Sequence, residues 1–308
     1  MRKRLLIAAE VDPQLAELAR ADGRFDVRLQ PVRGEEALAG AIGDAEVLVT
    51  RAYNKVTSRV IDAAPELELI AQATSGIDNI DAEAARRRSI SIINLPGENA
   101  NAVAELVIGF MLALTRTVPF YTREVAAGRW PREDCATRHE MRHHRLGIIG
   151  LGQVGGRVAK LAAAFGMNPS AYDPYITEAA FAERGARRLH SLEELLASSD
   201  IVTLHVPLTS ETRHMIDAKA ISRTPRGVIL INAARGEVMD QNAALASLAS
   251  GHTGGLALDV FDPEPPATPL PDDPRLILTP HIAGCTHECR GALAETLFRR
   301  ISDFYATR

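Results

Sequence analysis

Short apolar runs alternate with longer amphipathic stretches in the first third of the chain. The stretches between the runs, such as residues 14–20 and 81–87, are rich in Ala, Glu and Arg and predict helices. The runs themselves predict buried strands at residues 5–9, 47–50, 67–71 and 90–93. Strands that alternate with helices in this way are typical of a parallel sheet covered by helices.

A long apolar helix, predicted over residues 99–116, separates this series from a second one. The second series predicts strands at residues 146–150, 169–172, 200–206, 227–232, 255–260 and 275–279. Ser191 and Glu194 form a capping-box pattern that opens one of its helices. A last helix is predicted over roughly residues 286–304. The whole chain therefore predicts an α/β fold with two doubly wound parallel-sheet domains.

The length, composition and charge limit the classes of protein to which the chain could belong. A length of 308 residues suggests two domains, and 46% hydrophobic with 24% charged residues is typical of globular proteins. The formal net charge of −4 disfavours a nucleic-acid-binding protein, because such domains are usually strongly basic. We therefore expect no nucleic-acid partner.

The cysteines and the apolar stretches indicate the compartment. Cys135, Cys285 and Cys289 are an odd number without a CxxC pair, which excludes a disulfide-dense secreted scaffold and fits a reducing compartment. The longest apolar stretch, residues 103–114, contains Glu105 and is shorter than the ~18–20 residues that span a bilayer. We expect a cytoplasmic protein without a membrane partner.

A glycine-rich motif connects the predicted strand 146–150 to a predicted helix. Gly150, Gly152 and Gly155 form GxGxxG, and Asp173 ends the next strand at about the spacing that dinucleotide-binding folds require. The first glycine permits a tight turn, the second lets the backbone approach a pyrophosphate, and the third lets the helix pack on the strand. The alternative is a glycine-rich turn without a ligand, but the strand before it and the helix after it favour the dinucleotide site.

The cofactor predicted from this motif is NAD. The helix that starts at Gln153 and Val154 offers N–H groups to the diphosphate. The carboxylate of Asp173 should accept hydrogen bonds from the ribose hydroxyls and repel a 2′-phosphate, which favours NAD over NADP. Arg157 and Arg187 keep NADP as an alternative, although each is more typical of a solvated surface charge.

Four predicted strands of the second series end in residues with functional chemistry. These ends carry His205 and Pro207, Ala233 and Arg235, Asp259 and Glu264, and His281. In a doubly wound sheet, ligands bind outside the carboxyl ends of the strands. Hydride transfer to a 2-oxo acid needs a cation for the carboxylate and a proton donor for the carbonyl oxygen. Arg235 and His281 fit these roles, and Glu264 can orient His281.

One of these positions, His205, also has a structural interpretation. We expect His205, Pro207 and Ala233 to line the cofactor site because they follow strands beside the glycine motif. The Val-Pro pair after His205 nevertheless favours a role for that residue in shaping the backbone.

Several long motifs resemble the D-isomer-specific 2-hydroxyacid dehydrogenases. They are LGIIGLGQVGGRVA, HVPLTSETRHMI, ILINAARGEVMD, ALDVFDPEPP and LTPHIAG, and the earlier segments are most similar to the phosphoglycerate dehydrogenase branch. The resemblance implies that Arg235 binds the substrate carboxylate, that His281 is the acid/base and that Glu264 pairs with it. It also implies that Asp259 lies near the nicotinamide amide. Two residues depart from the family pattern. Gln153 stands where many relatives carry Arg or His, and Cys285 stands where they usually carry a small or β-branched residue.

The resemblance also implies an organisation of domains. A flavodoxin-like substrate domain would comprise residues 1–98 and be completed by the C-terminal helix, residues 284–308. A Rossmann-like cofactor domain, residues 99–283, would be inserted into it and would form a homodimer that includes the helix at 99–116. Because the sequence ends at Arg308, we expect no C-terminal regulatory domain.

Four residues of the predicted substrate domain are candidates for substrate binding. The resemblance implies that backbone N–H groups around Ser75, Gly76 and Ile77 bind the substrate carboxylate. Arg51 ends a predicted strand and would bind a second anionic group, such as a phosphate, although a plain surface arginine is equally compatible with the sequence. The substrate is therefore predicted to be a small 2-hydroxy or 2-oxo acid, with 3-phosphoglycerate or a similar dianion as the candidate.

One motif points to a different chemistry. His139, Glu140 and His143 match HExxH, the zinc peptidase pattern. Neighbouring arginines oppose a dication, and no third ligand is evident, so we expect no metal. Cys285, His287 and Cys289 could also suggest a metal site. At this spacing on a helix, however, His287 points away from the two cysteines, so we expect these residues to have ordinary packing roles.

Two other functions remain compatible with the motifs. One is a glyoxylate or hydroxypyruvate reductase, and the other is a dehydrogenase-like protein that binds NAD(H) as a sensor. A panel of 2-oxo acids with both reduced cofactors would distinguish them.

Overall fold

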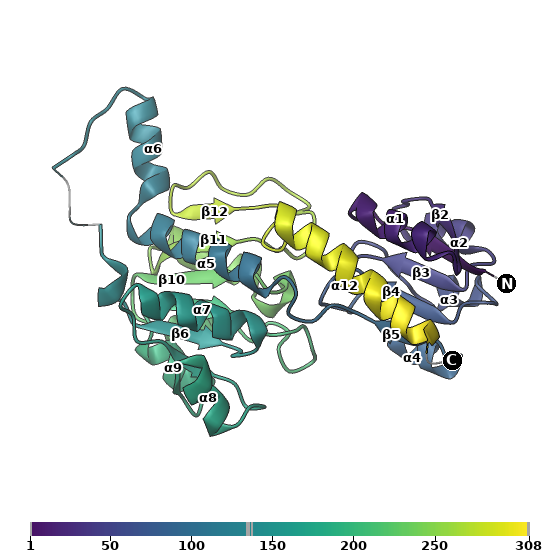
Figure 1. Cartoon of the computed structure of the whole chain (residues 1–308). Helices are drawn as coiled ribbons and strands as arrows, with labels where there is room; N and C mark the ends of the chain where they lie inside the picture. Colours follow the sequence, from purple (N-terminus) through teal and green to yellow (C-terminus); the bar gives the residue numbers. More distant parts are fainter. Residues whose placement is uncertain (1, 134–135, 137, 307–308) are drawn as a thin grey trace. The chain divides into compact units, whose positions relative to one another are not determined.

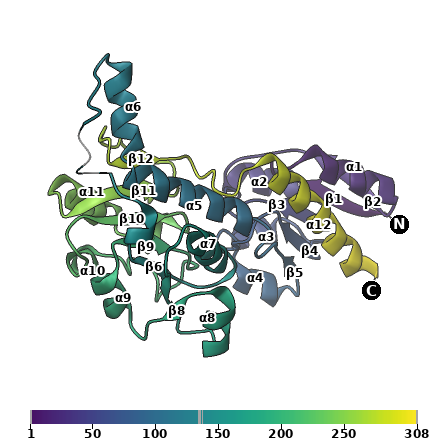
Figure 2. The ribbon, with the colours of Figure 1, turned by 60° about the vertical axis from the view of Figure 1, so that its left-hand side comes forward.

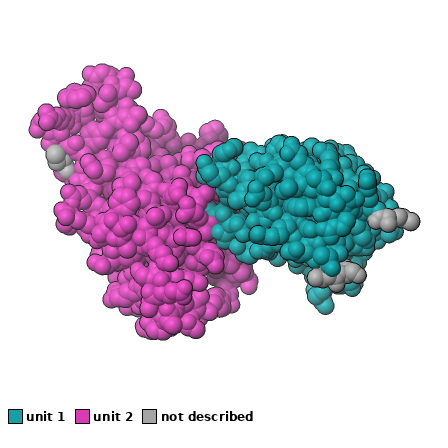
Figure 3. Space-filling model, in the orientation of Figure 1, with its two compact units in different colours: residues 1–99, 285–308 teal, residues 100–284 magenta. Residues whose placement is uncertain are grey.

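The chain divides into two compact units. The computed structural model describes residues 2–133, 136 and 138–306, drawn in Figure 1 and, turned by 60°, in Figure 2. Unit 1 comprises Met1–Asn99 and Cys285–Arg308, and unit 2 comprises Ala100–Gly284 (Figure 3). Unit 1 is therefore built from both ends of the chain.

Unit 1 contains a five-stranded parallel sheet with the order β2-β1-β3-β4-β5. Its strands are β1 (Lys3–Ile7), β2 (Phe25–Leu29), β3 (Val47–Thr50), β4 (Leu69–Gln72) and β5 (Ser91–Ile93). The predicted strand at residues 5–9 is shifted, because the structure starts β1 two residues earlier. Strand β2 was not predicted. It lies at the edge of the sheet and buries only Phe25, so its sequence lacks an apolar run.

Helices cover this sheet. They are α1 (Pro13–Asp22), α2 (Glu35–Ile42), α3 (Ser58–Asp62), α4 (Ala82–Arg87) and α12 (His287–Ala306). Helix α1 has strong end signals, since Asp12 accepts a hydrogen bond from the Gln14 N–H at 3.0 Å and Gly23 ends it with φ +75°. The C-terminal helix α12 packs beside α1, and Phe298 of α12 meets Phe25 edge to face.

Unit 2 contains a seven-stranded parallel sheet with the order β12-β11-β10-β9-β6-β7-β8. The strands are β6 (Leu146–Ile149), β7 (Ser170–Tyr172), β8 (Arg187–Arg188), β9 (Ile201–Leu204), β10 (Val228–Asn232), β11 (Thr253–Leu258) and β12 (Leu276–Leu278). The order reverses between β6 and β9, which is the position where ligands bind in doubly wound sheets. Both sheets are parallel, so the predicted fold class is confirmed.

Helices also cover the sheet of unit 2. They are α5 (Ala100–Thr115), α7 (Gln153–Ala164), α8 (Glu178–Arg184), α9 (Leu192–Ser198), α10 (Ala218–Ser222) and α11 (Gln241–Ala249), with short 3₁₀ turns at Met141–His143 and Gly236–Val238. Helix α6 (Val118–Ala126) has no buried residue and projects away from the sheet (Figure 1). The predicted cap at Ser191 is confirmed, because its Oγ accepts a hydrogen bond from the Glu194 N–H at 3.1 Å. Glu194 in turn accepts one from the His190 N–H, also at 3.1 Å.

The apolar helix α5 packs against α7 in the core of unit 2. Among the described residues, no single helix is long and apolar enough to cross a membrane. Helices α5 and α6 together satisfy that test by length and composition, but they are bent by 62° at their junction. The buried side chains of α5, including Val107, Phe110 and Met111, account for its apolar character through packing.

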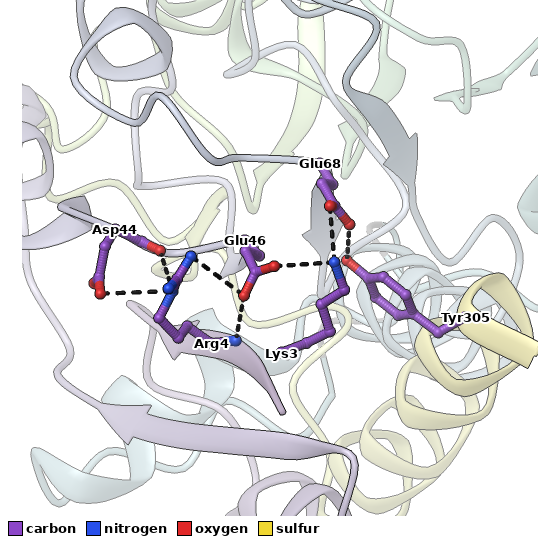
Figure 4. Close-up of polar contacts among 6 residues, drawn as sticks. All are labelled: Lys3, Arg4, Asp44, Glu46, Glu68 and Tyr305. Atoms are coloured by element: carbon purple, nitrogen blue, oxygen red, sulfur yellow. Dashed lines mark hydrogen bonds and ion pairs between the residues drawn. The ribbon is translucent and has the colours of Figure 1, made fainter. Parts of the chain in front are cut away.

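Charged side chains gather in unit 1 where β1, β3 and β4 begin (Figure 4). Lys3 Nζ donates to Glu46 Oε1 at 2.9 Å and to Glu68 Oε1 at 2.8 Å. The Tyr305 hydroxyl donates to Glu68 Oε2 at 3.1 Å, and Glu46 accepts from the Arg4 N–H at 3.0 Å. The two carboxylates raise the pKa of Lys3, so its ammonium group stays charged. This cluster attaches the end of α12 to the sheet.

We expect Lys3→Met to destabilise unit 1, because the substitution removes the cation that contacts both Glu46 and Glu68 and leaves Glu46 only its ion pair with Arg4. The side chains are partly exposed, so the loss should be about 1–2 kcal/mol. Urea unfolding at low salt measures it, and 1 M salt should reduce the difference through screening. Arg20→Met, on the exposed side of α1, is the control. An equal loss in both variants would contradict a specific role for the cluster.

Candidate active site

The loop between β6 and α7 brings the glycines of the motif close together. Gly150 has φ +86°, and a Cβ there would lie 2.6 Å from the His205 carbonyl oxygen. A Cβ at Gly155 would lie 2.1 Å from the Gly150 carbonyl oxygen. Neither position accepts a side chain, so α7 begins directly against the end of β6. A Cβ at Gly152 would meet no atom within 4 Å, so the backbone there faces open space.

Asp173, the residue after β7, is tied to this loop. Its Oδ2 accepts a hydrogen bond from the Leu151 N–H at 2.9 Å, and its Oδ1 accepts one from the Tyr175 N–H at 3.0 Å. A carboxylate has about four lone-pair positions, so two remain for donors such as ribose hydroxyls. Gln153 and Val154 occupy the first turn of α7, where N–H groups have no partner within the helix. These residues fit a dinucleotide.

Three further residues predicted to bind the cofactor follow β9 and β10. His205 Nε2 lies 2.9 Å from Thr203 Oγ1, and burial lowers the pKa of His205 to about 3, so the ring is neutral at physiological pH. The Pro207 carbonyl accepts a hydrogen bond from Thr212 Oγ1 at 2.6 Å. Ala233 packs against the core of unit 2. The contacts of these residues with a cofactor stay predictions.

A buried amide organises the loop after β10. Asn232 Nδ2 donates to the Arg235 carbonyl oxygen at 2.8 Å, and its Oδ1 accepts from the Ala234 N–H at 3.1 Å. Arg235 Nη1 donates to the Ala234 carbonyl oxygen at 2.7 Å. The backbone of Arg235 is therefore held by a side chain that ends an apolar strand.

A buried carboxylate organises the loop after β12. Asp259 is fully buried, and its Oδ1 accepts from Thr279 Oγ1 at 2.6 Å and from the Ile282 N–H at 2.8 Å. Its Oδ2 accepts from the Ala283 N–H at 2.9 Å, and its carbonyl oxygen accepts from the His281 N–H at 2.8 Å. These bonds fix the loop on both sides of His281. The predicted contact of Asp259 with the nicotinamide amide stays a prediction.

His281 and Glu264 lie together. His281 Nδ1 is 2.6 Å from Glu264 Oε1, and the two side chains are 37% and 41% exposed. His281 also has φ +54°, a strained conformation for a residue with a side chain, and such strain gathers at functional sites. A histidine oriented by a carboxylate and open to solvent can donate and accept a proton.

In unit 1, amide side chains organise the loops after β3 and β4. Gln72 is fully buried, and its Nε2 donates to the Gly76 carbonyl oxygen at 3.0 Å and to Asn79 Oδ1 at 2.8 Å. Asn79 Nδ2 donates to the Arg51 carbonyl oxygen at 3.1 Å. Asn54 Oδ1 accepts from the Arg51 N–H, also at 3.1 Å. The amides therefore fix the backbone at Arg51 and Gly76.

The residues predicted to bind substrate lie on these loops. Ser75 Oγ donates to the Leu95 carbonyl oxygen at 2.9 Å, and Ile77 is 37% exposed. Arg51 Nη1 donates to the Glu10 carbonyl oxygen at 3.1 Å. Their roles in substrate binding stay predictions.

The residues that shape the loops were not predicted from the sequence. These are Asn54, Gln72, Asn79, Asn232 and Thr279. Three of them, Gln72, Asn232 and Thr279, end or directly follow an apolar strand, and that position was the available signal. A polar side chain there is buried only when it has hydrogen-bond partners.

The HExxH sequence does not form the helix that a zinc peptidase requires. Met141–His143 is a single 3₁₀ turn, and Glu140 before it has an extended backbone. Glu140 Oε2 lies 2.7 Å from Arg142 Nε and 3.7 Å from His143 Nε2. Within residues 2–133, 136 and 138–306, no group of three or more His, Cys, Asp or Glu side chains could hold a metal ion.

The cysteines of unit 1 differ in burial. Cys285 is exposed, with its Sγ 4.0 Å from Arg51 Nη2, whereas Cys289 is buried in α12. Burial raises the pKa of the Cys289 thiol. Cys135 lies outside the described residues.

Comparison with known proteins points to one family. Residues 108–283 match the family model described as D-isomer specific 2-hydroxyacid dehydrogenase, NAD binding domain. A D-3-phosphoglycerate dehydrogenase of Methanocaldococcus jannaschii is 40% identical over 268 residues, which are 87% of this chain and 51% of that protein. The chain spans about half the length of the curated relatives it matches.

Two solved structures show the likeness over almost the whole chain. A D-lactate dehydrogenase from Aquifex aeolicus complexed with NAD and lactic acid has a TM-score of 0.89 at 28% identity, covering 99% of this chain and 96% of its own. A glyoxylate reductase from Paecilomyes thermophila has a TM-score of 0.88 at 28% identity, covering 98% and 94%.

We expect His205 to make the folded protein less stable in acid. Its pKa of about 3 in the folded state lies below its ordinary value of 6.5, so only the unfolded ring takes up a proton as the pH falls below 6.5. This contribution to stability is complete above pH 6.5 and is lost progressively as the pH falls toward 3. Between pH 6.5 and 4.5, the free energy of unfolding of His205→Gln should therefore fall by about 2–3 kcal/mol less than that of the wild type. Urea unfolding at several pH values measures both, and parallel curves would contradict the assignment.

Proposed function

Because the chain belongs to the D-isomer specific 2-hydroxyacid dehydrogenase family, we propose that it is an NAD-dependent dehydrogenase that interconverts a small 2-hydroxy acid and its 2-oxo acid. The observation that carries this proposal is the contact between His281 and Glu264, 2.6 Å long, on a loop fixed by the buried Asp259. This loop follows the carboxyl end of a strand in the same sheet as the glycine motif. The site therefore combines a proton donor with a dinucleotide motif.

Each catalytic residue has one role. Arg235 binds the substrate carboxylate, because a guanidinium pairs with a carboxylate through two parallel hydrogen bonds. Glu264 holds His281 through Nδ1, so the ring presents Nε2 to the substrate oxygen. In reduction, His281 gives a proton to the carbonyl oxygen, and in oxidation it takes the hydroxyl proton. NADH, when bound, supplies the hydride.

The cofactor site is proposed at the carboxyl ends of β6, β7, β9, β10 and β11. Its residues are Gly150, Gly152, Gln153, Val154, Gly155, Asp173, His205, Pro207, Ala233 and Asp259. The open backbone at Gly152 and the start of α7 would accept the pyrophosphate. Asp173 would bind the ribose hydroxyls and disfavour a 2′-phosphate.

The proposed substrate carries two anionic groups. Arg51 would bind the second one, and the N–H groups around Ser75, Gly76 and Ile77 would bind the carboxylate. Relatives named D-3-phosphoglycerate dehydrogenase support 3-phosphoglycerate or a similar dianion. Residues 1–98 with 284–308 would then form the substrate domain, and residues 99–283 the cofactor domain.

We also propose that the protein is a cytoplasmic homodimer. Helix α6 and the segment after it expose apolar side chains, with Val118 at 50%, Val125 at 52% and Trp130 at 76% exposure. Such a cluster is typical of a surface that another chain covers, and a second copy through unit 2 is the proposed partner. The cysteine usage supports the reducing compartment.

A panel of 2-oxo acids tests the activity. The wild type should oxidise NADH with at least one of 3-phosphohydroxypyruvate, hydroxypyruvate and glyoxylate. His281→Ala should lower kcat by about 10²–10⁴-fold, because general acid catalysis is lost, while NADH still binds. His190→Ala, an exposed histidine after β8 at the opposite end of the strand order from β12, is the matched control. Binding of NADH without turnover of any acid would instead favour a sensor, and preference for glyoxylate would favour the reductase.

The cofactor preference is a separate prediction. We expect the wild type to use NADH better than NADPH, and Asp173→Ala to reduce that preference by about tenfold or more, because the carboxylate no longer repels a 2′-phosphate. The ratio of kcat/KM for the two cofactors measures it. Asp62→Ala, an exposed position in unit 1, should leave the ratio unchanged. A wild type that prefers NADPH would contradict the role given to Asp173.

A further inference from the structure

Tyr53 contacts two neighbouring loops at the carboxyl edge of the sheet in unit 1. The strand order β2-β1-β3 places the loops that follow these three parallel strands side by side. The Tyr53 hydroxyl, on the loop after β3, accepts a hydrogen bond from the N–H of Glu10, on the loop after β1, at 2.6 Å. The guanidinium of Arg33, on the loop after β2, lies over the tyrosine ring, with 4.6 Å between its Cζ atom and the ring centre. One side chain therefore joins three loops.

The Glu10 main chain that Tyr53 holds is also a partner of Arg51. Arg51 Nη1 donates to the Glu10 carbonyl oxygen at 3.1 Å, and Arg51 Nη2 lies 4.0 Å from Cys285 Sγ. The guanidinium is thus in contact at both terminal nitrogens, and one of these contacts is made by a segment that the Tyr53 hydroxyl fixes. A guanidinium carries five N–H donors, so several remain for an anion.

The main chain beneath Tyr53 is rigid, because the next residue is a buried amide. Asn54 is fully buried, and its Nδ2 donates to the Val32 carbonyl oxygen at 2.9 Å and to the Ala8 carbonyl oxygen at 3.4 Å. Its Oδ1 accepts from the Arg51 N–H at 3.1 Å. This side chain therefore ties the loops after β1, β2 and β3 to one another, and Tyr53 starts from a fixed position.

The Tyr53 hydroxyl is the side-chain group that fixes the Glu10 main chain. The side chain of Glu10 makes a different contact, in which Oε1 lies 3.5 Å from Arg33 Nη2. The two side chains of that ion pair are 65% and 70% exposed, so water and salt weaken it. The N–H of Glu10, by contrast, is bound to a phenol whose ring packs against a cation.

A guanidinium that is held before a ligand arrives binds an anion at a smaller cost. An arginine side chain has several rotatable bonds, and ordering them during binding lowers the affinity. Only a ligand that reaches Arg51 gains from this earlier ordering. A 2-oxo acid with a second anionic group at its far end, such as 3-phosphohydroxypyruvate, reaches it in the proposed binding mode. Glyoxylate has only its single carboxylate, so it gains nothing from Arg51.

We propose that Tyr53 is a positioning residue that raises the preference for dianionic over monoanionic 2-oxo acids. It holds the Glu10 main chain, and this segment fixes the guanidinium of Arg51 for the second anion. The inference rests on the proposed function, because it requires Arg51 to bind that second group. Tyr53 acts through Arg51 rather than on the substrate itself.

The ratio of kcat/KM for 3-phosphohydroxypyruvate and glyoxylate tests the proposal. Tyr53→Phe keeps the ring against Arg33 but removes the acceptor of the Glu10 N–H. We expect kcat/KM for 3-phosphohydroxypyruvate to fall about three- to tenfold, mainly through a higher KM, because one hydrogen bond that orders the binding group is lost. The value for glyoxylate should change less than twofold.

Tyr305→Phe is the matched control. Tyr305 also uses its hydroxyl in a hydrogen bond within unit 1, to Glu68, but this bond lies at the amino end of β4. The variant loses a phenol hydroxyl from the same unit and should leave the ratio for the two acids unchanged. An equal change of the ratio in both variants would show a general effect on the fold of unit 1 and would overturn the proposal.

Arg51→Ala tests whether Tyr53 acts through Arg51. This variant should lower kcat/KM for 3-phosphohydroxypyruvate more than Tyr53→Phe does, because the cation itself is lost. Tyr53→Phe added to Arg51→Ala should cause no further loss, since no guanidinium remains to be positioned. Losses that add would mean that Tyr53 acts by another route, and the positioning role would be wrong.

The outcomes also separate this inference from the proposed function. If the wild type reduces both acids and Tyr53→Phe lowers both values alike or neither, the positioning role is wrong while the dehydrogenase assignment stands. A wild type that reduces glyoxylate but does not prefer the phosphorylated acid would overturn the role of Arg51 and with it that of Tyr53. If the wild type reduces no 2-oxo acid with NADH, both proposals are overturned.

Discussion

The candidate active site depends on one buried charge. Asp259 is fully buried, and its two oxygens accept hydrogen bonds from one hydroxyl and two backbone N–H groups of residues 279–283. Burying a carboxylate is unfavourable unless such donors replace water, so these hydrogen bonds favour the arrangement of the loop that satisfies the charge. That arrangement places His281 at φ +54° with its side chain against Glu264. The geometry of the His281–Glu264 pair therefore follows from the solvation of a neighbouring acid.

The same principle acts with neutral groups at other strand ends. Asn232 holds the backbone of Arg235 from the end of β10, and Gln72 and Asn79 hold the loops of unit 1. The carboxyl ends of parallel strands lie at one edge of a sheet, but the loops that follow them lack the regular hydrogen bonds of the strands. A buried polar side chain at the strand end supplies the missing partners. Function at this edge thus requires polar residues inside an otherwise apolar core.

The sequence predicted the elements with strong apolar patterns and missed those without them. The strands β9 and β10 are wholly buried and were evident, whereas β2 and β8 lie at sheet edges with few buried residues. His281 and Glu264 were predicted as a pair by residue type, and the structure brings them together. The hydrogen bonds of Asp259 reach residues 20 to 24 positions away, so no local pattern could reveal them. The role of a residue whose partners are distant in the sequence can therefore be recognised only from the folded structure.

The residue that shapes the loop and the pair that would move the proton differ in their exposure to solvent. The acid that shapes the loop is inaccessible to water, whereas the pair that would move the proton is 37% and 41% exposed. A proton donor must be reprotonated after each turnover, which requires contact with solvent. An orienting charge gains strength from exclusion of solvent, because its hydrogen bonds are then stronger and meet no competition from water. Exchanging the two environments would leave His281 cut off from protons and its loop free to rearrange.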